Sequence, residues 1–444
     1  MKSLRRAHLE ADTYQPSLDD SRLVRWSVYA LMAFPVIDYS LRRFVPVAGH
    51  AWDKVIFAIL VISAFSRYIR GKRPPRFSWH VFALLFIIYG LFLVAAGLRT
   101  HPIQALEGYQ FDVYYLLFTF PLPFLIGPKD VRPLLHFGVV VAVAIGAHAI
   151  YQYITKVPIP PHWADTHEHV RTRVFSVIKS PNELGAYMAL NIPILAGLAL
   201  SEKLKSRKVF YFAGVVICFA ALLFTFTRGA WMALVLSTLI LSIIVDRRLL
   251  LFVIAFAIVA FFVPAIHHRI LDLTSPIYWH KTIKYGRFAR WMTGIHKLSK
   301  DPLFGAGLGQ YGGAVAAKYG HSVYSDDFYV KILGETGIVG LVLFITMHFA
   351  LVRSLYQKVR STVARRQRVL LAGGLTGILA ILFHNLTENV FEYAPLVLSY
   401  FMYAMLFLIL GTQVANSGIA GEKVNKSIVR DRRTDEETSL QNGP

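Results

Sequence analysis

The chain has 444 residues, of which 55% are hydrophobic and 16% are charged, and its formal net charge is +21. A soluble globular protein carries about 25% charged residues, so this composition excludes an ordinary soluble domain and indicates a membrane protein. On such a chain, excess Lys and Arg indicate topology and contact with membrane lipid, and we expect no nucleic-acid partner. The single cysteine, Cys218, excludes an intramolecular disulfide and a cysteine-based metal cluster.

Apolar stretches predict an all-α polytopic membrane protein with about twelve transmembrane helices, because roughly 20 residues cross the ~30 Å hydrocarbon core. The stretches are residues 24–40, 52–69, 78–98, 107–127, 133–155, 182–200, 208–224, 229–245, 249–266, 332–353, 368–390 and 393–415. The first stretch lacks a small-residue cleavage signal, so we expect an uncleaved helix rather than a signal peptide.

The distribution of Lys and Arg predicts the orientation of these helices. With the N-terminus in the cytoplasm, 29 of the 47 Lys and Arg residues lie on the inner side. Most of the other 18 lie in two long loops, 156–181 and 267–331, which can cross the membrane regardless of charge. We therefore expect both termini in the cytoplasm.

This topology divides the chain into five regions. A cytoplasmic tail, 1–23, precedes transmembrane helices 1–9, 24–266. A large extracytoplasmic loop, 267–331, is expected to hold short helices and precedes transmembrane helices 10–12, 332–415. The polar tail 416–444 is predicted to be cytoplasmic and disordered.

The first cluster of polar residues precedes the predicted helix 182–200. Arg171 and Arg173 lie upstream of Ser180, Pro181 and Asn182. Ser180 or Asn182 could cap the helix, with Pro181 in its first turn. One interpretation is capping with solvated arginines, and the other is a phosphate site formed by a helix N-terminus and two arginines.

Arg228 lies in a short turn between two apolar spans, followed by Gly229. An arginine at hydrocarbon depth costs roughly 2.5–3.5 kcal/mol on insertion scales, unless it snorkels or meets a partner. A snorkelling side chain is one interpretation. We favour an arginine that binds an anion in a water-filled cavity, because Gly229 leaves room for close approach.

Arg287 and Arg290 are three residues apart and would share a helical face. The run Gly305-x-Gly307-x-Gly309 follows them. We interpret the glycines as a tight turn rather than a nucleotide-binding loop, because no predicted strand precedes them.

A further cluster lies at the start of the predicted helix 332–353. It contains His321, Asp326, Asp327, Tyr329 and Glu335. The acids could be solvated helix caps, or one of them could take a proton from a nucleophilic hydroxyl as a general base. Asp326, His321 and Glu335 are the candidate bases, and Asp327 and Tyr329 are candidate substrate contacts.

His384 and Glu388 lie at the outward end of the eleventh predicted span. Polar packing between helices is the plain interpretation. Ionisable groups at this depth are also functional candidates, so we add His384, Glu388 and Asn182 to the candidate substrate contacts. Together, these clusters predict an extracytoplasmic pocket for an anionic, phosphate-bearing, lipid-linked ligand.

Four segments carry a resemblance to a known family. In chain order they are RVFSVIKSPNELGAYMAL, FTFTRGAWMAL, GRFARWMTGIHKLSKDPLFGAGLGQYGG and DDFYVKILGETGIVG. With these segments, residues 100–395 resemble the O-antigen ligase and polymerase superfamily of WaaL- and Wzy-like membrane proteins. The resemblance implies a GT-C-like fold and glycosyl transfer without a metal or another cofactor.

The resemblance also implies roles for single residues. Arg228 matches the arginine of the family's Thr/Ser-Arg-Gly turn, and Arg287 matches the arginine four residues before a tryptophan, here Trp291. With Arg173, Arg171 and Arg290 they would hold the diphosphate of the donor. Asp326 stands where the ligases have a histidine, and His321 lies five residues too early. This departure favours the polymerase-like branch.

The implied function is transfer or polymerisation of undecaprenyl-diphosphate-linked glycan at the outer face of a bacterial inner membrane. The acceptor would be a glycan or a lipid-linked sugar, and a flippase and a chain-length regulator would be partners. Two alternatives stay open: a ligase that moves finished glycan to a lipid A core or a protein, and a transporter or flippase of lipid-linked saccharides.

Overall fold

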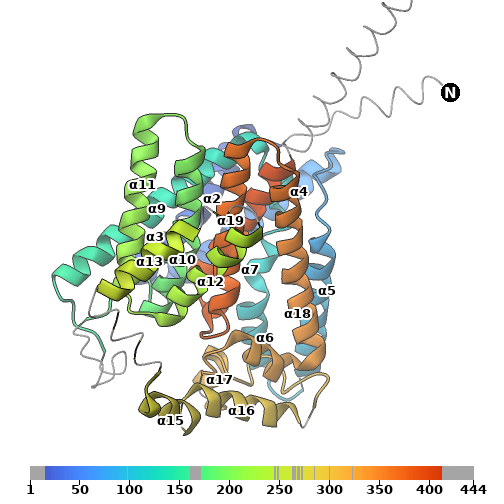
Figure 1. Ribbon diagram of the computed structural model, residues 1–444. Helices are drawn as coiled ribbons and strands as arrows, with labels where there is room; N and C mark the ends of the chain where they lie inside the picture. The colour runs from blue at the N-terminus through green and yellow to red at the C-terminus, as the bar shows by residue number, and fades with distance from the viewer. Residues whose placement is uncertain are drawn as a thin grey trace, which may run out of the picture.

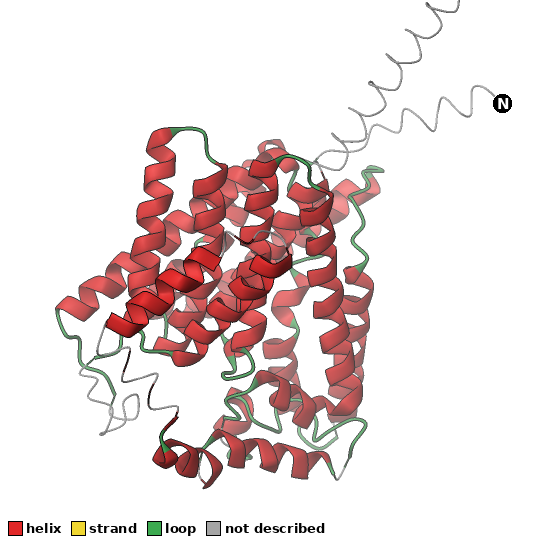
Figure 2. Cartoon of the chain, viewed as in Figure 1, coloured by secondary structure: helices red, strands yellow, loops and turns green. Residues whose placement is uncertain are grey.

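The computed structural model describes residues 16–97, 99–160, 172–244, 247, 250–262, 267, 271, 274–284, 286–299, 301–322 and 324–412. Their regular secondary structure is helical, with no strand among them (Figures 1 and 2). Eight helices are long and apolar enough to cross a membrane: α4 (Pro46–Ile69), α5 (Trp79–Gly97), α9 (Pro128–Ile154), α10 (Pro181–Ser201), α11 (Lys205–Phe224), α18 (Phe328–Ser361), α19 (Arg365–His384) and a last helix, Ala394–Thr412. The predicted all-α polytopic membrane fold is confirmed.

Four of the predicted spans are shorter or divided, so the count of twelve is not reproduced among the described helices. The first divides into α2 (Arg22–Met32) and α3 (Phe34–Phe44), with Pro35 in the first turn of α3. The fourth divides into α6 (Pro102–Asp112), α7 (Tyr114–Leu117) and α8 (Leu122–Leu125). Prolines lie at the starts of α3, α6 and α8 and explain those helix starts, because proline cannot continue a preceding helix, whereas α7 starts without one. The eighth and ninth are α12 (Arg228–Ile244) and α13 (Leu250–Phe262).

The centre of the bundle is formed by α10 and the last helix. In each of them 94% of the apolar window is buried, compared with 22% for α4 and 33% for α5. Apolar side chains of α4 and α5 are exposed and would contact lipid, since a membrane protein needs no water-facing polar surface there. The central α10 packs against α19, α11 and α12, so its ends are fixed by several neighbours.

The predicted large loop contains α15 (Pro276–Lys284), α16 (Arg287–Leu298) and α17 (Ala314–Lys318). Figure 1 shows all three at one end of the bundle, with α15 and α16 lying crosswise to α18. One short 3-10 helix, Leu18–Asp20, precedes α2, and another, Val390–Glu392, lies between α19 and the last helix. The tails 1–15 and 413–444, including the predicted disordered segment, lie outside the described residues.

The glycine-rich loop after α16 fills a break in α18. Gly337 has a φ of 66°, which interrupts the helix. The Ala306 amide donates to the Gly334 carbonyl at 2.8 Å, and the Ile338 amide donates to the Pro302 carbonyl at 2.9 Å. Both broken helix ends are therefore satisfied by the loop, as buried backbone groups require. These glycines form turns, which agrees with the interpretation that they are not a nucleotide-binding loop.

Candidate functional site

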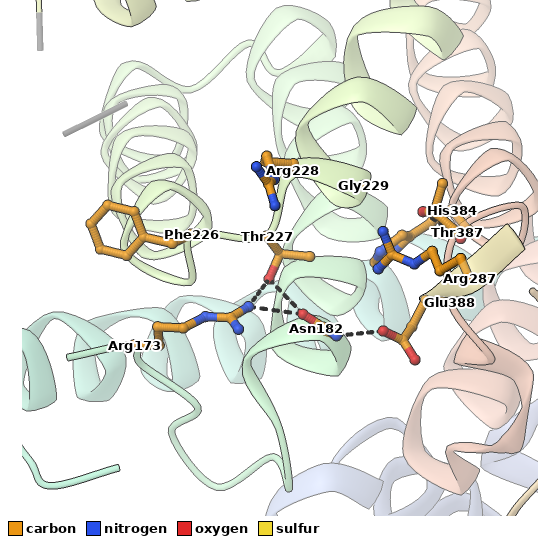
Figure 3. A pocket seen from close by; sticks show the side chains of 10 residues that line it. All are labelled: Arg173, Asn182, Phe226, Thr227, Arg228, Gly229, Arg287, His384, Thr387 and Glu388. Atoms are coloured by element: carbon orange, nitrogen blue, oxygen red, sulfur yellow. Dashed lines mark hydrogen bonds between the residues drawn. The ribbon is translucent and has the colours of Figure 1, made fainter. Parts of the chain in front are cut away.

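A cavity of about 110 Å³ opens at the end of the bundle where α10, α12 and α16 begin and α19 ends. Figure 3 shows the side chains that surround it. They are Arg173, Asn182, Phe226, Thr227, Arg228, Gly229, Arg287, His384, Thr387 and Glu388. Six of them are residues that the sequence singles out as site candidates, and they come from four separate segments of the chain.

Arg173 forms one wall of the cavity and is held by hydrogen bonds. Its Nε donates to the Thr225 carbonyl at 2.9 Å, and its Nη2 donates to Asn182 Oδ1 at 2.9 Å. Ser180 is the residue that caps α10, since its hydroxyl accepts from the Glu183 amide at 3.3 Å. Asn182 is therefore released from capping and its side chain faces the cavity (Figure 3). The Arg171 prediction lies outside the described residues.

Arg228 is the first residue of α12 and lines the cavity from a tight turn. The preceding Phe226 has a φ of 53°, so the chain turns sharply between α11 and α12. Gly229 allows α12 to approach the end of α19, because a Cβ there would lie 2.3 Å from Thr387 Oγ1 and 3.1 Å from the His384 ring. The close approach that Gly229 permits brings Arg228 and His384 to the same cavity.

Arg287 is the first residue of α16, and it reaches the cavity from the side opposite Arg173 (Figure 3). Its Nε lies 3.8 Å from Asp326 Oδ2, and Arg290 Nη1 lies 2.6 Å from the same oxygen. Asp326 thus joins the two arginines of α16, while neither Arg290 nor Asp326 lines the cavity itself.

Glu388 is the one carboxylate among the cavity-lining residues of the described chain. The side-chain amide of Asn182 donates a hydrogen bond to Glu388 Oε2, and the backbone amide of Asn389 donates to Glu388 Oε1 at 3.3 Å. Burial raises the pKa of Glu388, and the charge of Asp326 raises it further. His384, the last residue of α19, has an Nδ1 atom that is buried without a hydrogen-bond partner among the described residues.

The structure places three other candidates away from the cavity lining. His321 Nε2 lies 3.2 Å from Gln104 Oε1 on α6, and its ring packs on His101. The Tyr329 hydroxyl donates to the Leu382 carbonyl at 2.9 Å. Asp327 caps α18, since its Oδ1 accepts from the Tyr329 amide at 2.8 Å. Burial raises the pKa of Asp327 to about 6.

Glu335 belongs to a buried charge cluster around Lys331 that was not predicted from the sequence. Lys331 Nζ lies 2.6 Å from Asp112 Oδ1, 2.9 Å from Glu335 Oε2 and 3.7 Å from Glu392 Oε1. The spacing of Lys331 and Glu335, four residues apart on one helix, was the available signal. The other two carboxylates come from distant segments, and no local pattern connects them to Lys331.

Three further residues line the cavity that were not predicted from the sequence: Phe226, Thr227 and Thr387. The Thr227 hydroxyl lies 3.2 Å from Arg173 Nη2 and 3.2 Å from Asn182 Oδ1, so it joins the two predicted residues. Its position beside Arg228 in the turn between two apolar spans was the signal that could have identified it.

Residues 213–345 match a family model that is described as O-antigen ligase. The predicted resemblance to the O-antigen ligase and polymerase superfamily is confirmed. The matched segment holds Arg228, Arg287 and Asp326, whereas Arg173, Asn182, His384 and Glu388 lie outside it. A search of curated proteins gives no match. The match covers 133 of the 444 residues, so it shows similarity to this family over that segment.

Proposed function

We propose that the chain is a membrane glycosyltransferase whose cavity holds the diphosphate of a polyprenyl-diphosphate-linked glycan. The observation that carries this proposal is the convergence of Arg173, Arg228 and Arg287, from three separate segments, on one small cavity. Guanidinium groups bind phosphate oxygens through planar, bidentate hydrogen bonds, which is why arginine is favoured at such sites. A flippase would need charges along a path through the bundle, and these charges gather at one end.

The volume of the cavity fits a diphosphate rather than a sugar chain. An engineered cavity of about 150 Å³ holds one benzene molecule, so about 110 Å³ has room for a small charged group. The glycan and the lipid would therefore extend from the opening. As the bond between the anomeric carbon and the diphosphate oxygen breaks, the arginines would stabilise the negative charge that develops on the leaving group.

We assign the general base to Glu388. The acceptor hydroxyl would lose its proton to this carboxylate while its oxygen attacks the anomeric carbon, in a single displacement with inversion. The sequence alone favours Asp326, but its carboxylate is engaged by Arg290 at 2.6 Å and does not line the cavity. Glu388 lines the cavity, and its raised pKa makes it a better proton acceptor than an ordinary glutamate. Asp326 would then position Arg287 and Arg290.

The side of the membrane and the acceptor are also part of this proposal. The excess of Lys and Arg in the short loops supports an outward-facing cavity and cytoplasmic termini in a bacterial inner membrane. Asp326 at the position of the ligase histidine supports a polymerase, which extends lipid-linked glycan, over a ligase.

The reaction itself tests the proposal. We expect purified protein in lipid vesicles to convert an undecaprenyl-diphosphate oligosaccharide into longer lipid-linked chains without ATP or added metal. The change Arg228→Lys keeps the charge but removes the bidentate guanidinium, so it should lower turnover by about 10²–10³. Arg365→Lys, at the far, exposed end of α19, is the matched control and should keep the wild-type rate. Full turnover by the Arg228→Lys protein would show that this arginine does not bind the leaving group.

A further inference from the structure

The segment that carries α15 and α16 has basic residues but no acidic ones. Between Asp272 and Asp301 the sequence contains no acidic residue and six basic ones: Lys281, Lys284, Arg287, Arg290, Lys297 and Lys300. Arg287 and Arg290 are engaged at the cavity and at Asp326. The other four basic residues are not part of that site, and their density makes this segment of the sequence strongly basic.

One face of α16 packs against the rest of the protein, and an adjacent apolar face is exposed. On the inner face, Trp291 Nε1 donates to the Ser325 carbonyl at 3.1 Å, and Gly294 packs against Tyr311. Phe288, Met292 and Ile295 form a second stripe, spaced four and three residues apart, and are 46%, 48% and 48% exposed. A regular stripe of large apolar side chains left exposed on a basic helix is the pattern of a membrane-surface helix.

This apolar stripe is continuous with the lipid-facing surface of the bundle. The chain that follows α16 carries Leu303 and Phe304, which are 55% and 40% exposed. The Phe304 ring lies 5.6 Å from the ring of Phe92, which is 52% exposed on the membrane-spanning α5. On α15, Trp279 and Ile283 are also exposed, at 54% and 56%. Figure 1 shows α15 and α16 lying crosswise at this end of the bundle, where an interfacial helix would lie.

We propose that α15 and α16 form a membrane-surface anchor, which inserts Phe288, Met292 and Ile295 at the headgroup boundary and binds anionic lipid headgroups through its basic residues. A second copy of the chain is the weaker candidate for this surface. A two-fold contact would place the same basic segment against itself, and like charges would repel. An anionic bilayer supplies acyl chains for the apolar stripe and negative charge for the basic residues.

The anchor has a consequence for the cavity. Because α16 begins at Arg287, contact of this helix with the membrane fixes that guanidinium at the level of the headgroups. The diphosphate of a lipid-linked molecule lies at the same level. The anchor itself goes beyond the proposed function and does not depend on it, since lipid contact can be measured without turnover.

A single introduced cysteine can test the anchor, because the native Cys218 is fully buried. Met292→Cys would carry an environment-sensitive bimane label in vesicles of phosphatidylcholine and phosphatidylglycerol. We expect strong quenching by lipids with brominated acyl chains and weak quenching by aqueous iodide. The matched control is Thr293→Cys, an exposed neighbour on a different side of α16, where iodide should quench and brominated lipid should not.

Equal iodide quenching at both positions, without quenching by brominated lipid at 292, would overturn the proposal. So would protection of position 292 from both quenchers that disappears when the protein is diluted to one copy per vesicle, since that result assigns the surface to a second copy. Both substitutions are at exposed positions, so neither is expected to disturb folding.

Discussion

The cavity and the Lys331 cluster both bring together charged side chains from distant segments. Basic side chains outnumber acidic ones in the cavity, and acidic side chains outnumber basic ones in the cluster. The cavity is lined by three arginines and one glutamate. In the cluster, one lysine lies within 3.7 Å of three carboxylates, and the side chains of Lys331, Asp112 and Glu335 are 2%, 1% and 0% exposed. The cavity opens to the surface of the molecule, whereas the Lys331 cluster is buried.

This difference separates a binding site from a structural one. Buried charges must be compensated nearby or neutralised. In the cluster, Lys331 compensates part of the negative charge, and burial raises the pKa of Glu392 to about 7, so this acid is partly protonated at neutral pH. The cavity has more positive than negative side chains among its lining residues, and it is open, so an anionic ligand can reach those side chains. We therefore infer that the cluster holds α6, α18 and the Val390–Glu392 turn together, and that the cavity binds an anion.

The largest effect is expected from removing the centre of the closed cluster. Lys331→Met would leave three buried carboxylates without their shared cation, and breaking such an arrangement costs about 3–5 kcal/mol of stability. Burial already raises the pKa of Glu392 to about 7 with Lys331 present. The folded yield and the midpoint of thermal aggregation in detergent should both fall strongly.

Lys318→Met is the matched control for this change. Lys318 also forms an ion pair, at 2.7 Å from Glu107 Oε1, but its side chain is 59% exposed. Exposed pairs contribute little to stability, so the midpoint should stay near the wild-type value. An equal fall for both lysines would contradict the distinction between a closed cluster and the protein surface.

In the cavity, we expect loss of function without loss of fold. Glu388→Gln removes the proposed base and should lower the rate by about 10²–10⁴, with an unchanged thermal midpoint. Asp326→Asn should lower the rate less, because it disturbs the arginines only indirectly.

The pH profile distinguishes the two carboxylates. The pKa of Glu388 is raised, so the rate should increase as pH rises through a value above the usual glutamate range of about 4.3. Since the charge of Asp326 contributes to that shift, Asp326→Asn should move the midpoint of the profile to lower pH. If Asp326 were the base, its replacement would instead remove this pH dependence.

The smallest effect is expected at His321. It hydrogen-bonds with Gln104 on α6 and does not line the cavity, so His321→Gln should keep most of the wild-type rate. A loss as large as that of Glu388→Gln, with an unchanged midpoint, would promote the histidine to a catalytic role and favour the ligase alternative.

The sequence predicts the cavity better than it predicts the cluster. Arg228, Asn182 and Arg287 each lie beside a helix start at the same predicted membrane face, so local signals place them together. The pairing of Lys331 with Asp112 spans 219 residues, and no local pattern reveals a contact over that separation. The divided first and fourth spans were missed because an apolar stretch looks continuous even where proline starts a new helix.

Binding of a diphosphate tests the central claim most directly. Affinity of the purified protein for undecaprenyl diphosphate can be measured by titration at a stated salt concentration, without any acceptor or turnover. We predict at least a tenfold weaker affinity for Arg287→Gln, or about 1.4 kcal/mol, and an unchanged affinity for Arg365→Gln. Equal affinities of the wild-type and Arg287→Gln proteins would contradict the assignment of the cavity as the diphosphate site.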